Sequence, residues 1–127
     1  MSKPKTIIWL SRHKPLPSQL RELNKRFGQH RLILDHRTFD GADDIIARAR
    51  AHNADEIVAV LPTTIALELS KRGIKPIKAH MVSVPCPAGE VRIGSRRRPR
   101  CYYFSHFRRI DAFELKDHPL SEESNEP

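Results

Sequence analysis

The chain has 127 residues, of which 39% are hydrophobic and 30% charged, and its formal net charge is +8. These values are typical of one globular domain that is large enough to bury a core without disulfides or metals. No apolar run approaches the roughly 20 residues that span a bilayer. The apolar stretch near the N-terminus is too short for a signal peptide, so we expect a cytoplasmic protein without a membrane partner.

Hydrophobic patterning predicts strands that alternate with helices. We expect strands over 6–10, 31–35, 56–61 and 77–84, and a helix after each of the first three. The first helix carries one apolar stripe and the third begins at Thr63 or Thr64 and ends at Gly73. Val91–Gly94 and 101–107 are predicted as two further strands. Right-handed crossovers then favour an α/β fold: a Rossmann-like three-layer sandwich with a mainly parallel sheet of order 2-1-3-4 and an added C-terminal basic β-hairpin.

Two polar turns follow the first and third predicted strands and would meet at the switch point of such a sheet. They contain Ser11, Arg12, His13 and Lys14, and Pro62, Thr63 and Thr64. Hydroxyls, cations, an imidazole and helix N-terminal N–H groups together predict a site for an anionic ligand. A polar surface turn and an ordinary helix cap are the alternatives. Neither GxxxxGK[ST] nor GxGxxG occurs, so an ATPase or a dinucleotide oxidoreductase is not expected.

The strongest charge cluster lies between the last two predicted strands. Residues 91–110 contain seven arginines and no acid, whereas the segment from Glu114 on carries a net −4, which leaves +12 on the first 113 residues. Arg96, Arg97 and Arg98 could clamp a polyanion or cover a ligand, or form a solvated hairpin tip. The aromatic residues beyond them could stack on nucleobases or pack in the core, and His106 could face the site. We expect one domain over 1–115 and an acidic, disordered tail over 116–127.

The cysteine and histidine patterns argue against a metal site. Cys86 and Cys101 lie in no metal-ligand spacing, and we expect both to be reduced thiols. The seven histidines form no HxH or HExxH motif, so neither a metal nor another cofactor is expected.

Three segments carry a resemblance to a known group of proteins. They are Ser11-Arg12-His13 after the first strand, the segment Ala54-Asp55 to Leu61-Pro62, and the turn Arg72-Gly73. In this order and spacing they resemble the small CRISPR-associated ring nucleases, whose core is related to the CRISPR-associated Rossmann-fold (CARF) domain. The resemblance covers about half of the chain. The basic hairpin and the acidic tail lie outside it.

The resemblance implies binding and degradation of a cyclic oligoadenylate such as cyclic tetra-adenylate, by a homodimer, which would switch off type III CRISPR antiviral signalling. Metal-independent attack by a ribose 2′-OH needs orientation, charge stabilisation and proton transfer. Ser11 or His13 could assist the proton, while Arg12, Lys14, the N–H groups of Thr63 and Thr64 or a hairpin arginine could stabilise charge. Three alternatives stay open: a cyclic-oligoadenylate sensor that does not cleave, a plasmid- or virus-encoded nucleic-acid-binding protein that uses the arginine-rich hairpin, and a structural subunit whose basic face docks an acidic protein.

Overall fold

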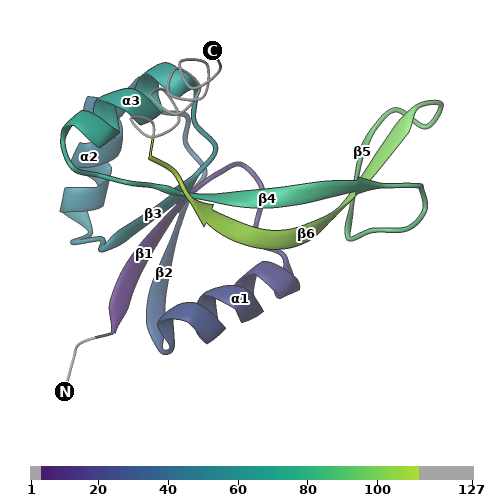
Figure 1. The fold of residues 1–127 in the computed structure, drawn as a ribbon, viewed down its shortest axis with the longest axis horizontal. Helices are drawn as coiled ribbons and strands as arrows, with labels where there is room; N and C mark the ends of the chain where they lie inside the picture. The colour runs from purple at the N-terminus through teal and green to yellow at the C-terminus, as the bar shows by residue number, and fades with distance from the viewer. Residues whose placement is uncertain (1–3, 112–127) are drawn as a thin grey trace, which may run out of the picture.

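A computed structural model describes residues 4–111 of the chain (Figure 1). Its elements in chain order are β1 (Lys5–Leu10), α1 (Pro17–Phe27), β2 (His30–Asp35), α2 (Ala42–Ala51), β3 (Glu56–Ala59), α3 (Thr63–Lys71), β4 (Ile77–Val84), β5 (Val91–Gly94) and β6 (Pro99–Arg109). Within this part of the chain, no helix has the length and apolar character needed to cross a membrane. The predicted tail over 116–127 lies outside the described residues.

The strands form one mixed sheet of six strands in the order β2-β1-β3-β4-β6-β5. Strands β2, β1, β3 and β4 are parallel neighbours, whereas β6 pairs antiparallel with both β4 and β5. The α/β class is therefore confirmed, but the structure contains one mixed sheet of six strands instead of a mainly parallel Rossmann-like sheet of order 2-1-3-4 with an added hairpin. The expected hairpin is part of the main sheet, because β6 pairs with β4 along the whole length of β4.

Helices cover both faces of the sheet, so the fold has three layers (Figure 1). On one face, α2 and α3 pack on β1 and β3, and the cluster of buried side chains there comprises Ile8, Leu10, Ala42, Ile45, Ile46, Ile57, Ala59 and Leu69. On the other face, Leu23 of α1 packs with a second cluster that comprises Ile7, Trp9, Val58, Ile77, Phe104 and Phe107. Alternate residues of β1 enter opposite clusters, as expected for a strand that is buried on both sides.

Strand β4 continues beyond the carboxyl end of β3. Only Val58 and Ile77 are paired between these strands, so the rest of β4 is paired with β6 alone. A bulge lies opposite the His80–Met81 step, where the partners change from His106 to Phe104 and leave Ser105 as an extra residue. In Figure 1 this two-stranded extension projects away from the helices and ends in the β5–β6 hairpin. The extension supplies one wall of the candidate site.

A disulfide links Cys86, in the loop after β4, to Cys101 of β6, with 5.4 Å between the Cα atoms. The prediction of two reduced thiols is therefore wrong. The antiparallel pairing of Val84 with Cys101 brings the loop after β4 back against β6, and this pairing places the two cysteines within bonding reach.

Candidate functional site

A cavity of about 590 Å³ lies at the carboxyl ends of β1 and β3, on the face of the sheet that α1 covers. Its lining residues are Trp9, Ser11, His13, Lys14, Leu16, Gln19, Val58, Ala59, Val60, Ala79, Met81, Glu90, Val91, Arg92, Ile93 and Tyr102. Most of these side chains are apolar, and the polar ones come from the turn after β1, from α1, from β5 and the loop before it, and from β6. Apolar walls with a few polar groups, within a volume of roughly 300–1,000 Å³, are typical of small-molecule sites.

The turn after β1 folds back over Trp9. The Trp9 Nε1–H donates a hydrogen bond to the His13 carbonyl oxygen at 2.9 Å, and the His13 N–H donates to Ser11 Oγ at 3.1 Å. Trp9 is buried, whereas the side chains of Arg12, His13 and Lys14 are exposed. The buried indole thus fixes the backbone of a turn whose basic side chains remain accessible to a ligand.

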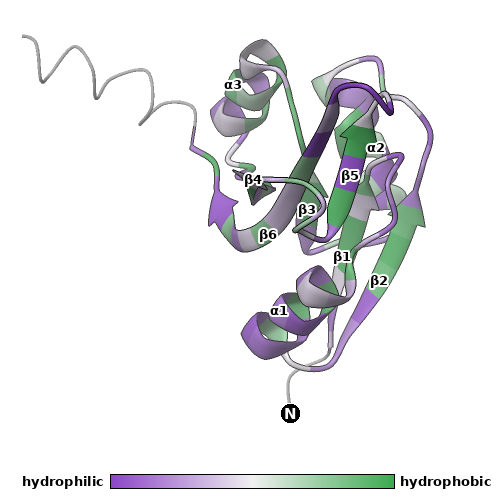
Figure 2. Cartoon of the chain, turned by 90° about the vertical axis from the view of Figure 1, so that its right-hand side faces the viewer, coloured by the Kyte–Doolittle hydropathy of each residue, from purple (hydrophilic) through white to green (hydrophobic). Residues whose placement is uncertain are grey.

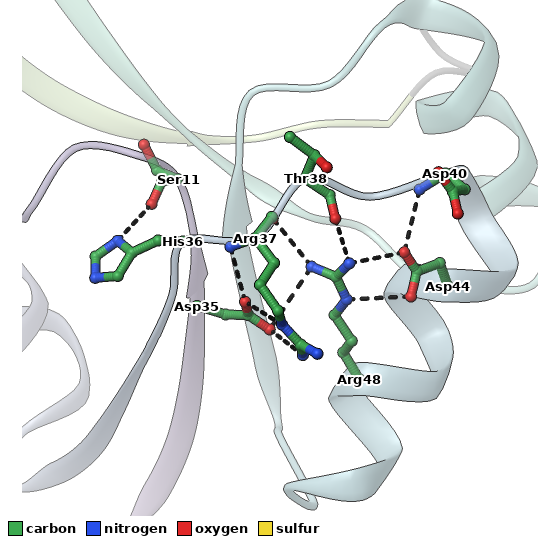
Figure 3. Close-up of polar contacts among 8 residues, drawn as sticks. All are labelled: Ser11, Asp35, His36, Arg37, Thr38, Asp40, Asp44 and Arg48. Atoms are coloured by element: carbon green, nitrogen blue, oxygen red, sulfur yellow. Dashed lines mark hydrogen bonds and ion pairs between the residues drawn. The ribbon is translucent and has the colours of Figure 1, made fainter.

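The carboxyl end of β2 supports this turn from the other side (Figure 3). The Ser11 N–H donates to the Asp35 carbonyl oxygen at 3.3 Å, and His36 Nδ1 donates to the Ser11 carbonyl oxygen at 3.1 Å. The Asp35 carboxylate is itself buried and accepts two hydrogen bonds from the Arg37 side chain, at 3.0 and 2.9 Å. These bonds hold the pKa of Asp35 well below its usual range, although burial acts in the opposite direction.

Arg48 of α2 connects this end of β2 to the helix layer. Its guanidinium lies 3.6 Å from the Asp35 carboxylate and donates to both carboxylate oxygens of Asp44, and it also donates to the carbonyl oxygens of Arg37 and Thr38 (Figure 3). The Arg48 side chain is only 10% exposed, so most of its donors are satisfied by the protein. This network makes the base of the Ser11 turn a rigid support.

The loop that enters β5 forms the opposite wall of the cavity. Gly89 has φ +100°, and an added Cβ would lie 2.6 Å from the Tyr102 carbonyl oxygen, so only glycine lets the loop approach β6 this closely. The backbone N–H of the next residue, Glu90, donates a hydrogen bond to the Tyr102 carbonyl oxygen at 2.7 Å. The Glu90 carboxylate accepts a hydrogen bond from the Phe104 N–H at 2.8 Å. The Cys86–Cys101 disulfide holds the same loop.

Among the described residues, Glu90 is the one acidic residue that lines the cavity. The nearby Ser18 hydroxyl, the Phe104 N–H and the positive charge of Arg21 lower its pKa, and of these groups the Phe104 N–H makes the well-formed hydrogen bond. The other charged or titratable residues that line the cavity within residues 4–111, apart from Tyr102, are His13, Lys14 and Arg92. An anionic ligand group would therefore be placed near the basic turn and Arg92, away from the Glu90 carboxylate.

Three of the predicted site residues line the cavity: Ser11, His13 and Lys14. Arg12 is exposed on the same turn but is not among the lining residues. Pro62 is the N-cap residue of α3, and Thr63 and Thr64 open that helix on the opposite face of the sheet; all three are exposed and none lines the cavity. The cavity is therefore lined by the turn after β1 and not by the turn after β3, because it lies on the α1 side of the sheet whereas Thr63 and Thr64 open a helix on the other side.

The predicted hairpin residues also lie outside the cavity. Arg96, Arg97 and Arg98 are exposed in the turn between β5 and β6, and Figure 2 shows this end of the hairpin in hydrophilic colours. His106 is exposed, and its partner across β4 is His80, whereas Phe104 and Phe107 point into the α1-side core. The bulge at Ser105 explains this arrangement: it places both phenylalanines on one face and His106 on the other.

Most of the cavity-forming residues could not be assigned from the sequence. Gln19 is buried, accepts the Leu16 N–H at 2.8 Å through its Oε1 atom, and directs its Nε2 atom toward Met81 Sδ at 3.7 Å. The position of Gln19 in the first turn of α1 signals a capping interaction, but it does not indicate a cavity. Arg92 and Tyr102 lie in the predicted hairpin, yet only their pairing in the sheet brings them opposite the turn after β1.

Among the residues that the structure describes, no cluster of three or more histidine, cysteine or acidic side chains is arranged to hold a metal ion. Comparisons of the chain with models of protein families, with characterised proteins and with solved structures find no match.

Proposed function

We propose that this chain binds a cyclic oligoadenylate, with cyclic tetra-adenylate as the first candidate, and cleaves it without a metal ion. The observation that carries the proposal is the cavity itself, in which apolar and aromatic walls lie beside the basic turn after β1. A nucleotide has the matching chemistry, because its base needs apolar or stacking surface and its phosphate needs cations and hydrogen-bond donors. The resemblance of the Ser11-Arg12-His13 turn to ring nucleases supports the choice of ligand.

Within the cavity, Trp9 and Tyr102 provide aromatic edges or faces for an adenine base. Lys14 and Arg92 provide positive charge for phosphates. A ring of four nucleotides is much larger than the ligands that one such cavity encloses. We therefore propose that two copies of the chain share the ring, each binding part of it.

Cleavage would proceed by attack of a ribose 2′-oxygen on the neighbouring phosphorus. The bond from phosphorus to the 5′-oxygen breaks, the 2′-proton leaves to a base, and the 5′-oxygen gains a proton, which leaves a 2′,3′-cyclic phosphate and a 5′-hydroxyl. His13 is proposed to transfer the proton, Ser11 to orient the 2′-hydroxyl and Arg12 to stabilise charge on the phosphoryl oxygens. In a type III CRISPR system this reaction would end the antiviral signal.

The test is incubation of the purified protein with cyclic tetra-adenylate in EDTA, followed by chromatography of the nucleotides. Linear products are expected, and Arg12→Ala and His13→Ala are each expected to slow single-turnover cleavage by about 10²-fold or more. Arg50→Ala and His52→Ala, which change exposed residues of the same types at the end of α2, are matched controls. Intact ligand that co-elutes with the protein would replace the nuclease with a sensor, and intact ligand that does not bind would refute the proposal for this ring.

A further inference from the structure

In the part of the chain that the structure describes, the face of the β4–β6 extension opposite the cavity is left open. The buried cluster under α2 and α3 contains residues of β1, β3 and the two helices but none from β4 or β6. The side chains that alternate onto this face are Lys78, His80, Val82, Tyr103, His106 and Arg108. Of these, His80 and Val82 are half-buried and the other four are exposed, with Tyr103 at 40% exposure.

This open face combines aromatic rings with positive charge. The rings of His80 and His106 lie against each other across the two strands, with centroids 5.0 Å apart and planes tilted by 36°. Val82 and Tyr103 form the next cross-strand pair toward the hairpin, and Lys78 and Arg108 form the pair on the other side. The rings of His80, His106 and Tyr103 and the neighbouring cations do not contribute to the buried clusters of the three-layer core.

No acidic residue belongs to these six positions. Within residues 4–111, two acids next to this end of the extension are engaged by other cations, since Glu56 accepts from Arg109 and Asp111 lies 3.2 Å from Lys75. At the opposite end, the β5–β6 turn adds the exposed Arg96, Arg97 and Arg98. The extension therefore has positive charge at both ends of a ring-bearing face.

We propose that this open sheet face, from Arg108 through the His80–His106 pair and Tyr103 to the arginines of the hairpin turn, binds single-stranded nucleic acid. Exposed bases stack on histidine and tyrosine rings, and the backbone phosphates lie along the cations, a combination that binds strands with little sequence preference. A duplex is a poor fit, because its bases are already stacked and their faces are not available. The site is separate from the cavity, since alternate residues of β4 face the two sides.

The experiment measures fluorescence anisotropy of a labelled single-stranded RNA of about 12 nucleotides, with the full chain and its disulfide intact, at about 50 to 200 mM salt. Tyr103→Ala and His106→Ala are each expected to weaken binding about tenfold. The double variant Lys78→Ala/Arg108→Ala is expected to lower the slope of log affinity against log salt by roughly 1.4, about 0.7 for each lost phosphate contact. Lys25→Ala/Arg50→Ala, which removes the same charge from exposed positions on α1 and α2, and His52→Ala are the matched controls.

Three results would overturn the proposal: no binding at the lowest salt, equal losses in the face variants and their controls, or equal affinity for a duplex of the same sequence. Competition separates this site from the cavity. Excess cyclic tetra-adenylate is expected to leave the labelled RNA bound, and full displacement would mean that RNA binds in the cavity instead. The assay does not depend on whether the ring ligand is cleaved, so it is informative even if the proposed nuclease activity is absent.

Discussion

Reduction of the Cys86–Cys101 disulfide should destabilise the protein by an amount that follows from its place in the chain. The bridge joins residues 15 positions apart. Cross-linking a loop of that length lowers the conformational entropy of the unfolded chain, which stabilises the folded state by about 3 kcal/mol. Divided by a urea m-value of roughly 2 kcal/mol per M, this corresponds to a shift of about 1.5 M in the unfolding midpoint. The loop in question forms a cavity wall, so the same reduction should loosen the site.

The assay is urea unfolding of the wild-type chain with and without a dithiol reductant, with the redox state verified by mass. Cys86→Ala/Cys101→Ala is the control, because its midpoint should not respond to the reductant. Hydrogen exchange on the native state should show faster exchange over 85–94 after reduction, while β1 and β3 change little. A wild-type midpoint that is the same in both redox states would refute the loop-entropy argument.

Three further predictions test the core, the β2 network and the turn after β1. Leu23→Ala, which removes a fully buried side chain of α1, should lower the free energy of unfolding by about 2–5 kcal/mol in urea titration, and a loss below 1 kcal/mol would contradict the packing described above. Asp35 has a lowered pKa in the folded state, so its stabilising effect is complete above its unfolded pKa, near 4, and is lost as the pH falls toward the folded pKa. Asp35→Asn should therefore reduce the loss of unfolding free energy that the wild-type protein shows between about pH 5 and 2. An unchanged dependence of stability on pH would show that the Arg37 contacts are not responsible. Trp9→Phe should cost about 1 kcal/mol through the lost bond to the His13 carbonyl oxygen, and it should also abolish the intrinsic fluorescence change that a cavity ligand causes, since Trp9 is the sole tryptophan.

Local patterns predicted most element positions because strands and helices reveal themselves by the spacing of nearby apolar residues. The strands at 77–84 and Val91–Gly94 have the predicted bounds, and α3 begins at Thr63. The third strand ends at Ala59, two residues earlier than expected, and Val60 is 67% exposed beside the cavity. The apolar run of the sequence therefore predicts that Val60 is a buried strand residue, whereas in the structure it lies beyond the strand and lines the cavity.

The turn after β1 was the part of the candidate site that sequence could locate. Ser11, His13 and Lys14 are contiguous and follow directly from the end of a buried strand, so their placement at the carboxyl edge needs only one local prediction. Combining them with Thr63 and Thr64 required the further prediction that the turns after β1 and β3 meet in one crevice. The helices after these strands do cover opposite faces of the sheet, as a switch point requires, but the cavity lies on the α1 side and neither Thr63 nor Thr64 lines it.

The sequence by itself determined the α/β class, most element positions, the basic turn after β1 and the concentration of arginine near the hairpin, all of which depend on residues close together in the chain. Tertiary structure decided the pairing of β6 with β4, the Cys86–Cys101 bridge, the cavity and the open face. Each of these depends on contacts between segments far apart in the sequence, and a single extra residue at Ser105 was enough to exchange the faces of Phe107 and His106. A strand's side chains alternate with a period of two, so one inserted residue reverses every later position, and composition carries no trace of it.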